Sequence, residues 1–372
     1  DEESRHTQLA AVGVSFLLIV ALNRTLRENG FFKNNIEILE PNLMNLLDIV
    51  ALGTVADMVP LTGVNRALVV QGLKVMGKRR NKGLSALADV AGMDEAPSTY
   101  HLGFLMGPRV NAGGRVGEAN LGAKLLATEN SQEAQIIAQT LDGYNAERRE
   151  IEASVLEEAL TLANEKAEKK SSQSLIFIAG EGWHPGVIGI VASRLKERYG
   201  LPACILTVQD GVATGSGRSI TGVDLGACII AARQAGILTN GGGHSMAAGF
   251  SLEAGKLDVF ETFLSERIGK QILEGGILPT LSVDGSISIE GASMELVEIL
   301  DKMGPFGIGN AEPRLVFSGV RMARVDIVGV NHIRCFMTGI DSKKQLSAIA
   351  FRCVDTDLGQ ALLQHNGLPL HV

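Results

Sequence analysis

The acid at the end of an apolar run is the first residue in this sequence with the chemistry to bind a metal ion. Asp57 closes the run LMNLLDIVALGTVADMVP at residues 43–60, which also contains Asp48. A buried, ionised carboxylate is costly unless a cation, a metal ion or hydrogen-bond donors compensate its charge. Asp57 is therefore either a cap before Pro60 or an oxygen ligand for Mg²⁺ or Mn²⁺. Asp48 has the same two interpretations, with a weaker case for the metal.

A stretch rich in glycine and arginine follows at residues 106–119, MGPRVNAGGRVGEA. We expect a loop in which Arg109 and Arg115 bond phosphate oxygens, with Asn111 and a glycine pair between them. Arginine makes paired hydrogen bonds to phosphate, and glycine lets the backbone come close to a ligand. Ordinary turns share this composition, so a structural interpretation stands beside the phosphate one.

The segment GEGWHPG at residues 180–186 predicts an anion site at the start of a helix. Its glycines, Gly180, Gly182 and Gly186, follow a G-x-G-x-x-x-G spacing that is one residue away from the dinucleotide-binding fingerprint, and Pro185 intervenes. We therefore exclude a dinucleotide-binding turn. His184 then either lies near an anion at the helix N-terminus or bonds the backbone at the helix start.

Two later segments complete the set of candidate residues. TGSGRS at 214–219 offers Ser216 and Arg218 on or beside a strand. GGGHSMAAG at 241–249 offers a run of backbone amides and a histidine, from Gly241, Gly242, Gly243 and His244. Because glycine weakens regular elements, we expect a loop whose free amides form an anion nest rather than a purely structural turn.

Composition limits the classes of function. A net charge of −7 excludes binding of nucleic acid by bulk positive charge, so any such contact is local. Aromatic residues make up 4%, which argues against extended base stacking. The cysteines form no CxxC pair, which favours a reducing cytosol and excludes a zinc ribbon. The apolar stretch at 10–22 is too short to cross a membrane, so we expect a buried helix.

The order of expected elements indicates an α/β fold in several parts. Helices are expected at 9–29, 64–77, 83–91, 120–128 and 131–170, the last being a charged linker helix. Strands at 175–179, 203–208 and 213–219 and helices at 187–199, 224–235 and 257–268 are expected next, and their alternation is typical of an α/β layer. Short alternating segments from Leu281 onward, beginning with residues 281–289, predict the β-hairpins of a small β-barrel. The predicted parts are 1–142, 143–173, 174–272 and 273–372, with a boundary near Ser172.

Together these motifs resemble the RecJ family of single-strand-specific 5′→3′ exonucleases in the DHH phosphoesterase superfamily. GGGHSMAAGF is similar to the Gly-Gly-Gly-His motif of DHHA1 domains, and GWHPGVIGIVASRL and SGRS follow the RecJ version of it. LDIVALGTVADMVPL and GPRVNAGGR resemble the last motifs of the DHH domain, and LDKMGPFGIGNAEPRLVF resembles the start of the OB-fold domain. The resemblance implies the C-terminal part of a DHH domain, a linker helix, a DHHA1 domain and a partial, truncated OB-fold barrel.

The resemblance also implies a role for each candidate residue. Asp57 would be a catalytic metal-ligand carboxylate for Mn²⁺ or Mg²⁺, and Arg109, Asn111 and Arg115 would line the substrate cleft. The pocket for the 5′-phosphate would contain Ser216 and Arg218. The Gly241–Gly243 run and His244 would contact substrate phosphate, with His184 a weaker assignment.

The family's two-ion centre also uses aspartate-rich motifs and an Asp-His-His triplet, and no such triplet occurs in these 372 residues. We expect those ligands to precede Asp1, so that the chain is a fragment that binds metal poorly and cleaves slowly or not at all. The implied whole enzyme takes a single strand with a 5′ end, releases mononucleotides, and works beside a helicase and single-strand-binding protein in recombination and repair.

Three alternatives remain open. The first is a shorter DHH/DHHA1 phosphodiesterase acting on very short RNA, pAp or cyclic dinucleotides, against which the β-rich C-terminal part argues. The second is a nucleic-acid-binding module without catalysis, against which a buried Asp57 argues. The third is a tRNA-editing relative, which the upstream motifs disfavour.

Overall fold

The computed structural model describes residues 6–169, 173–277, 280–339, 344–365 and 367–372. The predicted boundary near Ser172 lies outside these residues. The chain forms two compact units, a larger one of residues 11–57 and 71–279 and a smaller one of residues 1–10, 58–70 and 280–372. Among the described helices, none combines the length and the apolar character that crossing a membrane requires.

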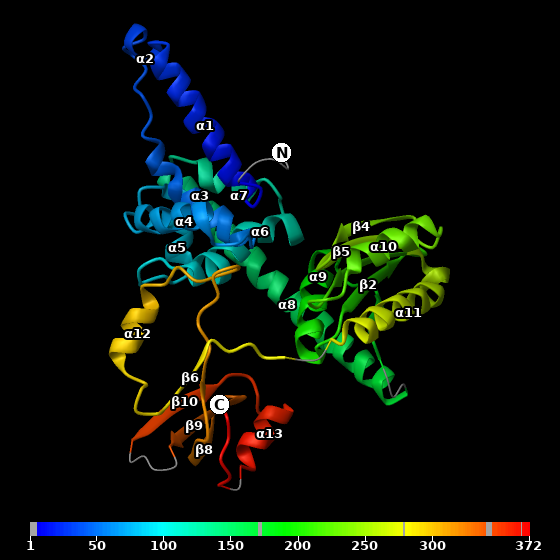
Figure 1. Cartoon of the computed structure of the whole chain (residues 1–372). Coiled ribbons are helices and arrows are strands. Elements are labelled where there is room, and N and C mark those ends of the chain that lie inside the picture. Colours follow the sequence, from blue (N-terminus) through cyan, green and yellow to red (C-terminus); the bar gives the residue numbers. More distant parts are fainter. Residues whose placement is uncertain (1–5, 170–172, 278–279, 340–343, 366) are drawn as a thin grey trace. The chain divides into compact units, whose positions relative to one another are not determined.

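The first part of the chain is helical (Figure 1). Within the described residues the predicted helices at 9–29, 64–77, 83–91, 120–128 and 131–170 all form, the last as far as Lys169, and the apolar run at 43–60 becomes a short 3₁₀ turn followed by a helix. The elements are α1 (Ala11–Glu28), α2 (Phe31–Asn34), η1 (Leu43–Leu46), α3 (Leu47–Ala56), α4 (Gly63–Met76), α5 (Lys82–Val90), the π-helix η2 (His101–Met106), α6 (Gly107–Val116), α7 (Leu121–Ala127) and α8 (Ser131–Lys169).

Helix α1 does not form the buried helix that its sequence predicts. Only Gly13, Phe16 and Asn23 are buried, and Leu18 is 69% exposed. Its apolar residues lie on more than one face, so a single packing surface covers only part of them.

The expected α/β layer follows as a five-stranded sheet with the strand order β1-β2-β3-β5-β4. Strands β1 and β2 are parallel, and the other pairs are antiparallel. The elements are β1 (Ile176–Glu181), α9 (Pro185–Tyr199), β2 (Ala203–Gln209), β3 (Val212–Arg218), α10 (Leu225–Gln234), β4 (Asn240–His244), β5 (Ala247–Glu253), η3 (Ala254–Lys256) and α11 (Leu257–Gly275).

Helices cover this sheet on both faces (Figure 1). Alternate residues of a strand point to opposite faces, so Phe177 packs with α10 and α11 while Ile176 and Ile178 pack with α8 and α9. On the first face, Phe260 of α11 is fully buried between Phe177 and Phe250, with ring centroids 5.7 and 5.1 Å away. The two packed faces fix the sheet that carries the candidate site.

The smaller unit contains the predicted short strands, together with two helices that the sequence pattern did not indicate. Strands β8 (Arg321–Val328), β9 (His332–Thr338) and β10 (Gln345–Ala350) form an antiparallel sheet in the order β10-β9-β8. A separate parallel pair joins β6 (Gly285–Ile287) to β7 (Leu315–Phe317), so residues 281–289 do not form the expected hairpin. The helices are α12 (Met294–Asp301) and α13 (Asp357–Leu363).

Candidate phosphate and metal site

Asp57 is exposed, which corrects the expectation that it is a buried acid. It follows the last turn of α3, and its backbone N–H donates to the carbonyl oxygen of Gly53 at 3.0 Å. Because water solvates the carboxylate, its negative charge needs no compensating cation, metal ion or hydrogen-bond donor. Asp57 and Asn111 line the same open cavity of about 280 Å³, whose other lining residues are mostly apolar.

Asp48 is the acid that the apolar run buries. It is 1% exposed, and one carboxylate oxygen accepts a hydrogen bond from the backbone N–H of Ile49 at 2.7 Å. Burial raises the pKa of the Asp48 carboxyl, and the backbone hydrogen bonds only partly oppose this. The side chain lines a different cavity from that of Asp57.

The predicted loop at residues 106–119 is wrong, because Gly107–Val116 forms helix α6. It continues directly from η2, and Pro108 occupies its first turn, where a missing N–H is harmless. Tight packing explains its glycines: a Cβ at Gly113 would lie 2.4 Å from the carbonyl oxygen of Glu118. Tertiary contacts therefore outweigh the low helix propensity of glycine.

The two arginines of α6 have different surroundings. Arg109 donates from Nε to Asp142 of α8 at 2.8 Å and from Nη1 to the carbonyl of Leu105 at 2.8 Å. Arg115 donates from Nη1 to the carbonyl of Gly186 at 3.1 Å and has no ion-pair partner within the described ranges. Arg109 is thus bound to the protein, whereas the charge of Arg115 is available to an anion.

His184 caps the start of helix α9. Its Nδ1 accepts a hydrogen bond from the backbone N–H of Gly186 at 3.1 Å. A Cβ at Gly186 would lie 2.5 Å from the carbonyl oxygen of Arg115, so only glycine allows this close approach of α9 to α6. The cap accounts for Nδ1 and leaves Nε2 as the atom that can reach a ligand.

Ser216 and Arg218 lie on one face of β3, beside helix α9. Arg218 Nη1 donates to Ser216 Oγ and to the carbonyl of Gly217, each at 2.9 Å. A Cβ at Gly189 would lie 3.0 Å from both Ser216 Oγ and Arg218 Nη2, so glycine makes room for the pair. Burial lowers the pKa of the Arg218 guanidinium, and the nearby charge of Arg115 lowers it further. No ion-pair partner of Arg218 is found in the described part of the chain.

The GGGH segment is an edge strand, which corrects the expected loop. Gly241 and Gly243 are explained by packing: a Cβ at Gly241 would lie 2.9 Å from Ile229, and one at Gly243 would lie 2.3 Å from the carbonyl oxygen of Ala247. Gly242 has open space instead. The amides therefore do not form a nest of consecutive free donors, although an edge strand leaves some of them unpaired with another strand.

Strand register places the remaining candidates together. Ser216 pairs with Gly249, which pairs with Gly242, and Arg218 and His244 both pair with Ala247. These two rows share one face because strand residues alternate. A Cβ at Gly242 or at Gly249 would meet nothing within 4 Å, so the row that begins at Ser216 continues as an open glycine floor beside the row of Arg218 and His244.

We use the name phosphate pocket for the group formed by Arg115, His184, Ser216, Arg218, Gly242 and His244, after the role that the resemblance implies for most of these residues. Two arginines without acidic partners in the described residues, a hydroxyl and an open glycine floor suit a phosphate group. Asn111 and Arg115 are four residues apart on α6, a rise of about 6 Å. Helix α6 therefore joins the phosphate pocket to the cavity that contains Asp57.

Sequence reasoning missed the pair formed by Arg148 and Glu152 on α8. Arg148 Nη1 donates to Glu152 Oε2 at 2.6 Å, and the two side chains are only 11% and 13% exposed. The signal in the sequence was an Arg and a Glu four residues apart in a helix, which is common on solvated helix faces. Their burial became visible only in the fold.

Comparisons with known families identify two domains in the chain. Residues 172–270 match the DHHA1 domain, and residues 283–366 match the RecJ OB domain. The chain is 39% identical over 364 residues to the single-stranded-DNA-specific exonuclease RecJ of Escherichia coli (strain K12), covering 94% of this chain and 61% of that protein. It is 32% identical over 347 residues to RecJ of Bacillus subtilis (strain 168), covering 92% of this chain and 42% of that protein.

A solved structure is also similar over most of the chain. The crystal structure of RecJ in complex with Mn²⁺ from Thermus thermophilus superposes with a TM-score of 0.74 at 27% identity, covering 92% of this chain and 48% of that one. The chain therefore contains a DHHA1 domain followed by a RecJ OB domain. The relatives and the solved structure named above are RecJ proteins, so the chain is similar to RecJ over more than nine-tenths of its own length. It spans 61% of the length of the first of these relatives.

The buried Asp48 yields a test by pH. Its raised folded-state pKa means that the folded protein holds this proton more tightly than the unfolded chain does. Protonated Asp48 stabilises the folded state fully below the ordinary aspartate pKa of about 3.9. This stabilisation is lost as the pH rises through the raised pKa of Asp48 in the folded protein. We expect Asp48→Asn to gain stability relative to the wild type across that window, measured by urea unfolding at several pH values. The exposed Asp94→Asn is the control, and parallel curves for Asp48→Asn and wild type would refute the assignment.

Proposed function

We propose that this chain is part of a metal-dependent exonuclease that digests single-stranded DNA from its 5′ end and serves in recombination and repair. The observation that carries the proposal is the convergence of Arg115 and Arg218, neither ion-paired within the described ranges, beside Ser216. A terminal phosphate monoester has the charge and the oxygen atoms that such a group binds. Similarity to RecJ exonucleases supports the same substrate class.

The phosphate pocket would hold the 5′ end, and the cleaved bond would lie toward Asp57. Helix α6 supports this direction, because Asn111 lines the cavity of Asp57 and Arg115 faces the pocket one turn later. Arg109, bound to Asp142, would stabilise α6 and line the cleft. Holding the terminal phosphate at a fixed distance from the cleavage site would give release of mononucleotides one at a time.

Asp57 would supply one oxygen ligand to a Mn²⁺ or Mg²⁺ centre. An exposed carboxylate beside an asparagine suits these oxygen-preferring ions, and the solved RecJ structures contain Mn²⁺ or Mg²⁺. The described residues include no group of three His, Cys, Asp or Glu side chains that could hold a metal ion. We infer that the other ligands come from an Asp-His-His-bearing segment outside this sequence. When bound, the ions would activate water and stabilise the leaving oxygen.

The OB domain would guide the incoming strand across one face of its sheet. Core residues Ile333, Cys335 and Met337 alternate along β9 with outward-facing ones, so Phe336 lies on the opposite face. Arg324 and Arg334 lie over its ring, 5.8 and 5.4 Å from the centroid. Both arginines also pair with Asp326, at 2.8 and 3.6 Å, so the ring of Phe336 is the feature of this face that would stack on the bases of a single strand.

A helicase and a single-strand-binding protein are proposed partners, because the substrate must be unwound and kept single-stranded. The four free cysteines are buried thiols, which supports work in the reducing cytoplasm. The OB domain favours this long-strand substrate over the very short oligonucleotides or cyclic dinucleotides of smaller DHH/DHHA1 enzymes.

Arg218→Ala tests the phosphate pocket. Removal of a charge-assisted contact should reduce the affinity advantage of a 5′-phosphorylated strand over a 5′-hydroxyl strand by about 10- to 100-fold. Fluorescence anisotropy with the two labelled oligonucleotides measures this ratio. Arg198→Ala, an exposed arginine on α9, is the matched control. An unchanged ratio in Arg218→Ala would overturn the pocket assignment.

Asp57→Asn tests the metal assignment in a longer polypeptide that includes the Asp-His-His-bearing segment. We expect hydrolysis of single-stranded DNA with Mn²⁺ or Mg²⁺ to fall at least about 100-fold, because loss of a metal contact costs this much or more. The 372-residue chain alone should hydrolyse DNA slowly or not at all. Asp94→Asn is the control. If the longer polypeptide is inactive with Asp57 intact, a binding module without catalysis becomes the better account.

Phe336→Leu tests the OB face. The substitution keeps an apolar side chain but removes the ring, so affinity for a long 5′-hydroxyl strand should fall about tenfold. Phe317→Leu, on the core side of the same domain, is the control for lost packing. Equal affinities of Phe336→Leu and wild type would remove this face from the proposed path of the strand.

A further inference from the structure

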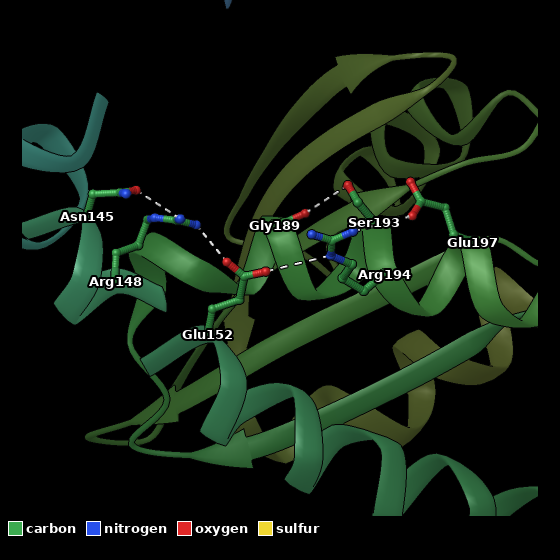
Figure 2. A network of polar contacts seen from close by, with 7 residues as sticks. All are labelled: Asn145, Arg148, Glu152, Gly189, Ser193, Arg194 and Glu197. Carbon is green, nitrogen blue, oxygen red and sulfur yellow. Dashed lines mark hydrogen bonds and ion pairs between the residues drawn. The ribbon is translucent and has the colours of Figure 1, made fainter. Parts of the chain in front are cut away.

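A chain of polar contacts links helix α8 to helix α9 (Figure 2). Arg148 donates from Nη1 to Glu152 Oε2 at 2.6 Å and from Nη2 to Asn145 Oδ1 at 3.0 Å. The second carboxylate oxygen of Glu152 lies 3.7 Å from Nε of Arg194 on α9. Glu152 therefore faces one arginine on its own helix and another on the neighbouring helix.

Most of this network lies in a largely buried position, where charged side chains are uncommon. Asn145 is 5% exposed, and the Arg148 and Glu152 side chains are 11% and 13% exposed. Nε of Arg148 is buried without a hydrogen-bond partner among the described residues. Burial lowers the pKa of Arg148, the charge of Glu152 raises it, and the charge of Arg115 lowers it again. Since a buried ion pair gives little or no net stability over an apolar pair, stability alone does not explain why this one lies here.

The network is next to two parts of the phosphate pocket, one reached through helix α9 and the other through helix α6. On α9, the Ser193 hydroxyl next to Arg194 donates to the carbonyl of Gly189 at 3.2 Å (Figure 2). Gly189 in turn lies against Ser216 and Arg218. A shift of α9 by a few tenths of an ångström would therefore change the space available to that pair.

On the α6 side, Arg148 belongs to the same group of charges as Arg115. Arg115 is bonded to Gly186 near the start of α9, so α6 and α9 already touch there. Glu152 pairs with Arg148, and its other carboxylate oxygen faces Arg194. Arg115 and Arg218 have no ion-pair partner in the described ranges. Glu152 therefore neutralises Arg148, whereas the charges of Arg115 and Arg218 stay available to an anion.

We propose that Glu152 is a positioning residue for the phosphate pocket. From α8 it holds Arg148 and Arg194, and it thereby fixes α9 at the distance from α6 and β3 that a terminal phosphate monoester requires. Glu152 acts through these arginines and does not touch the phosphate. This inference rests on the proposed function, because it concerns discrimination between a 5′-phosphate and a 5′-hydroxyl end.

The test measures that discrimination in the 372-residue chain. Glu152→Gln keeps the shape of the side chain and removes its charge. We expect the affinity ratio between 5′-phosphorylated and 5′-hydroxyl strands to fall about tenfold, as small displacements of binding groups do, with the affinity for the 5′-hydroxyl strand unchanged. Glu197→Gln is the matched control, because Glu197 also faces Arg194, at 3.9 Å, but is 60% exposed. It should leave the ratio unchanged.

A purely structural role gives a different result. If Glu152→Gln lowers the melting temperature but keeps the wild-type ratio, the proposal is overturned. If Glu152→Gln does not fold, Arg194→Met tests the same contact from its half-exposed side, and an unchanged ratio there overturns it equally. Arg218→Ala distinguishes failure of the positioning role from failure of the phosphate pocket itself. If the affinity ratio falls in Arg218→Ala but not in the Glu152 and Arg194 variants, only the positioning role is refuted. If the ratio falls in none of them, the phosphate pocket is refuted.

Discussion

Helix α8 packs against α6, α9 and β1, the elements that carry or adjoin the phosphate pocket, and the arrangement of the candidate site depends on it. Near its start, Asp142 accepts from Arg109 of α6 at 2.8 Å. Further along, Glu158 accepts from the indole N–H of Trp183, just before α9, at 2.8 Å. Near its end, Lys166 donates to Glu261 of α11 at 2.8 Å. One continuous helix has a fixed rise per residue, so these contacts set the spacing between α6 and the DHHA1 sheet.

The electrostatics of the site are local, as the net charge of −7 requires. Arg109 and Arg148 are neutralised by acids on α8, whereas Arg115 and Arg218 lie close together without such partners in the described ranges. Two like charges held near each other repel, and a bound phosphate relieves that repulsion. The fold thus concentrates positive charge at one point of an acidic protein, where we propose that the 5′ end of a strand binds.

Much of the fold was predictable because local signals and tertiary packing agree. The strands at 175–179, 203–208 and 213–219 are apolar or alternating, and the helix that begins after His184 has a proline in its first turn. The DHHA1 and OB domains were predicted from their motifs and are confirmed by the family matches. The exact domain boundaries remain predictions.

The failures share one physical cause, which is that glycine and charge depend on contacts remote in sequence. Gly113 and Gly243 suggested loops, but each sits in a regular element where a side chain would collide with a carbonyl oxygen. Asp57 and Asp48 lie in the same apolar run, and only the fold shows that the first is exposed and the second buried. Arg148 carries no local signal of burial, so its place beside the pocket could not be predicted.

Hydrogen–deuterium exchange of the chain with a 5′-phosphorylated oligonucleotide tests the central claim most directly. The account predicts joint protection of the backbone amides in segments 107–117, 184–190, 214–219 and 240–245, because one phosphate is held by all four. With a 5′-hydroxyl strand, protection of 184–190 and 214–219 should be lost while that of β8–β10 remains. Protection confined to β8–β10 with both oligonucleotides would contradict the account, since the strand would then bind the OB face without using the pocket.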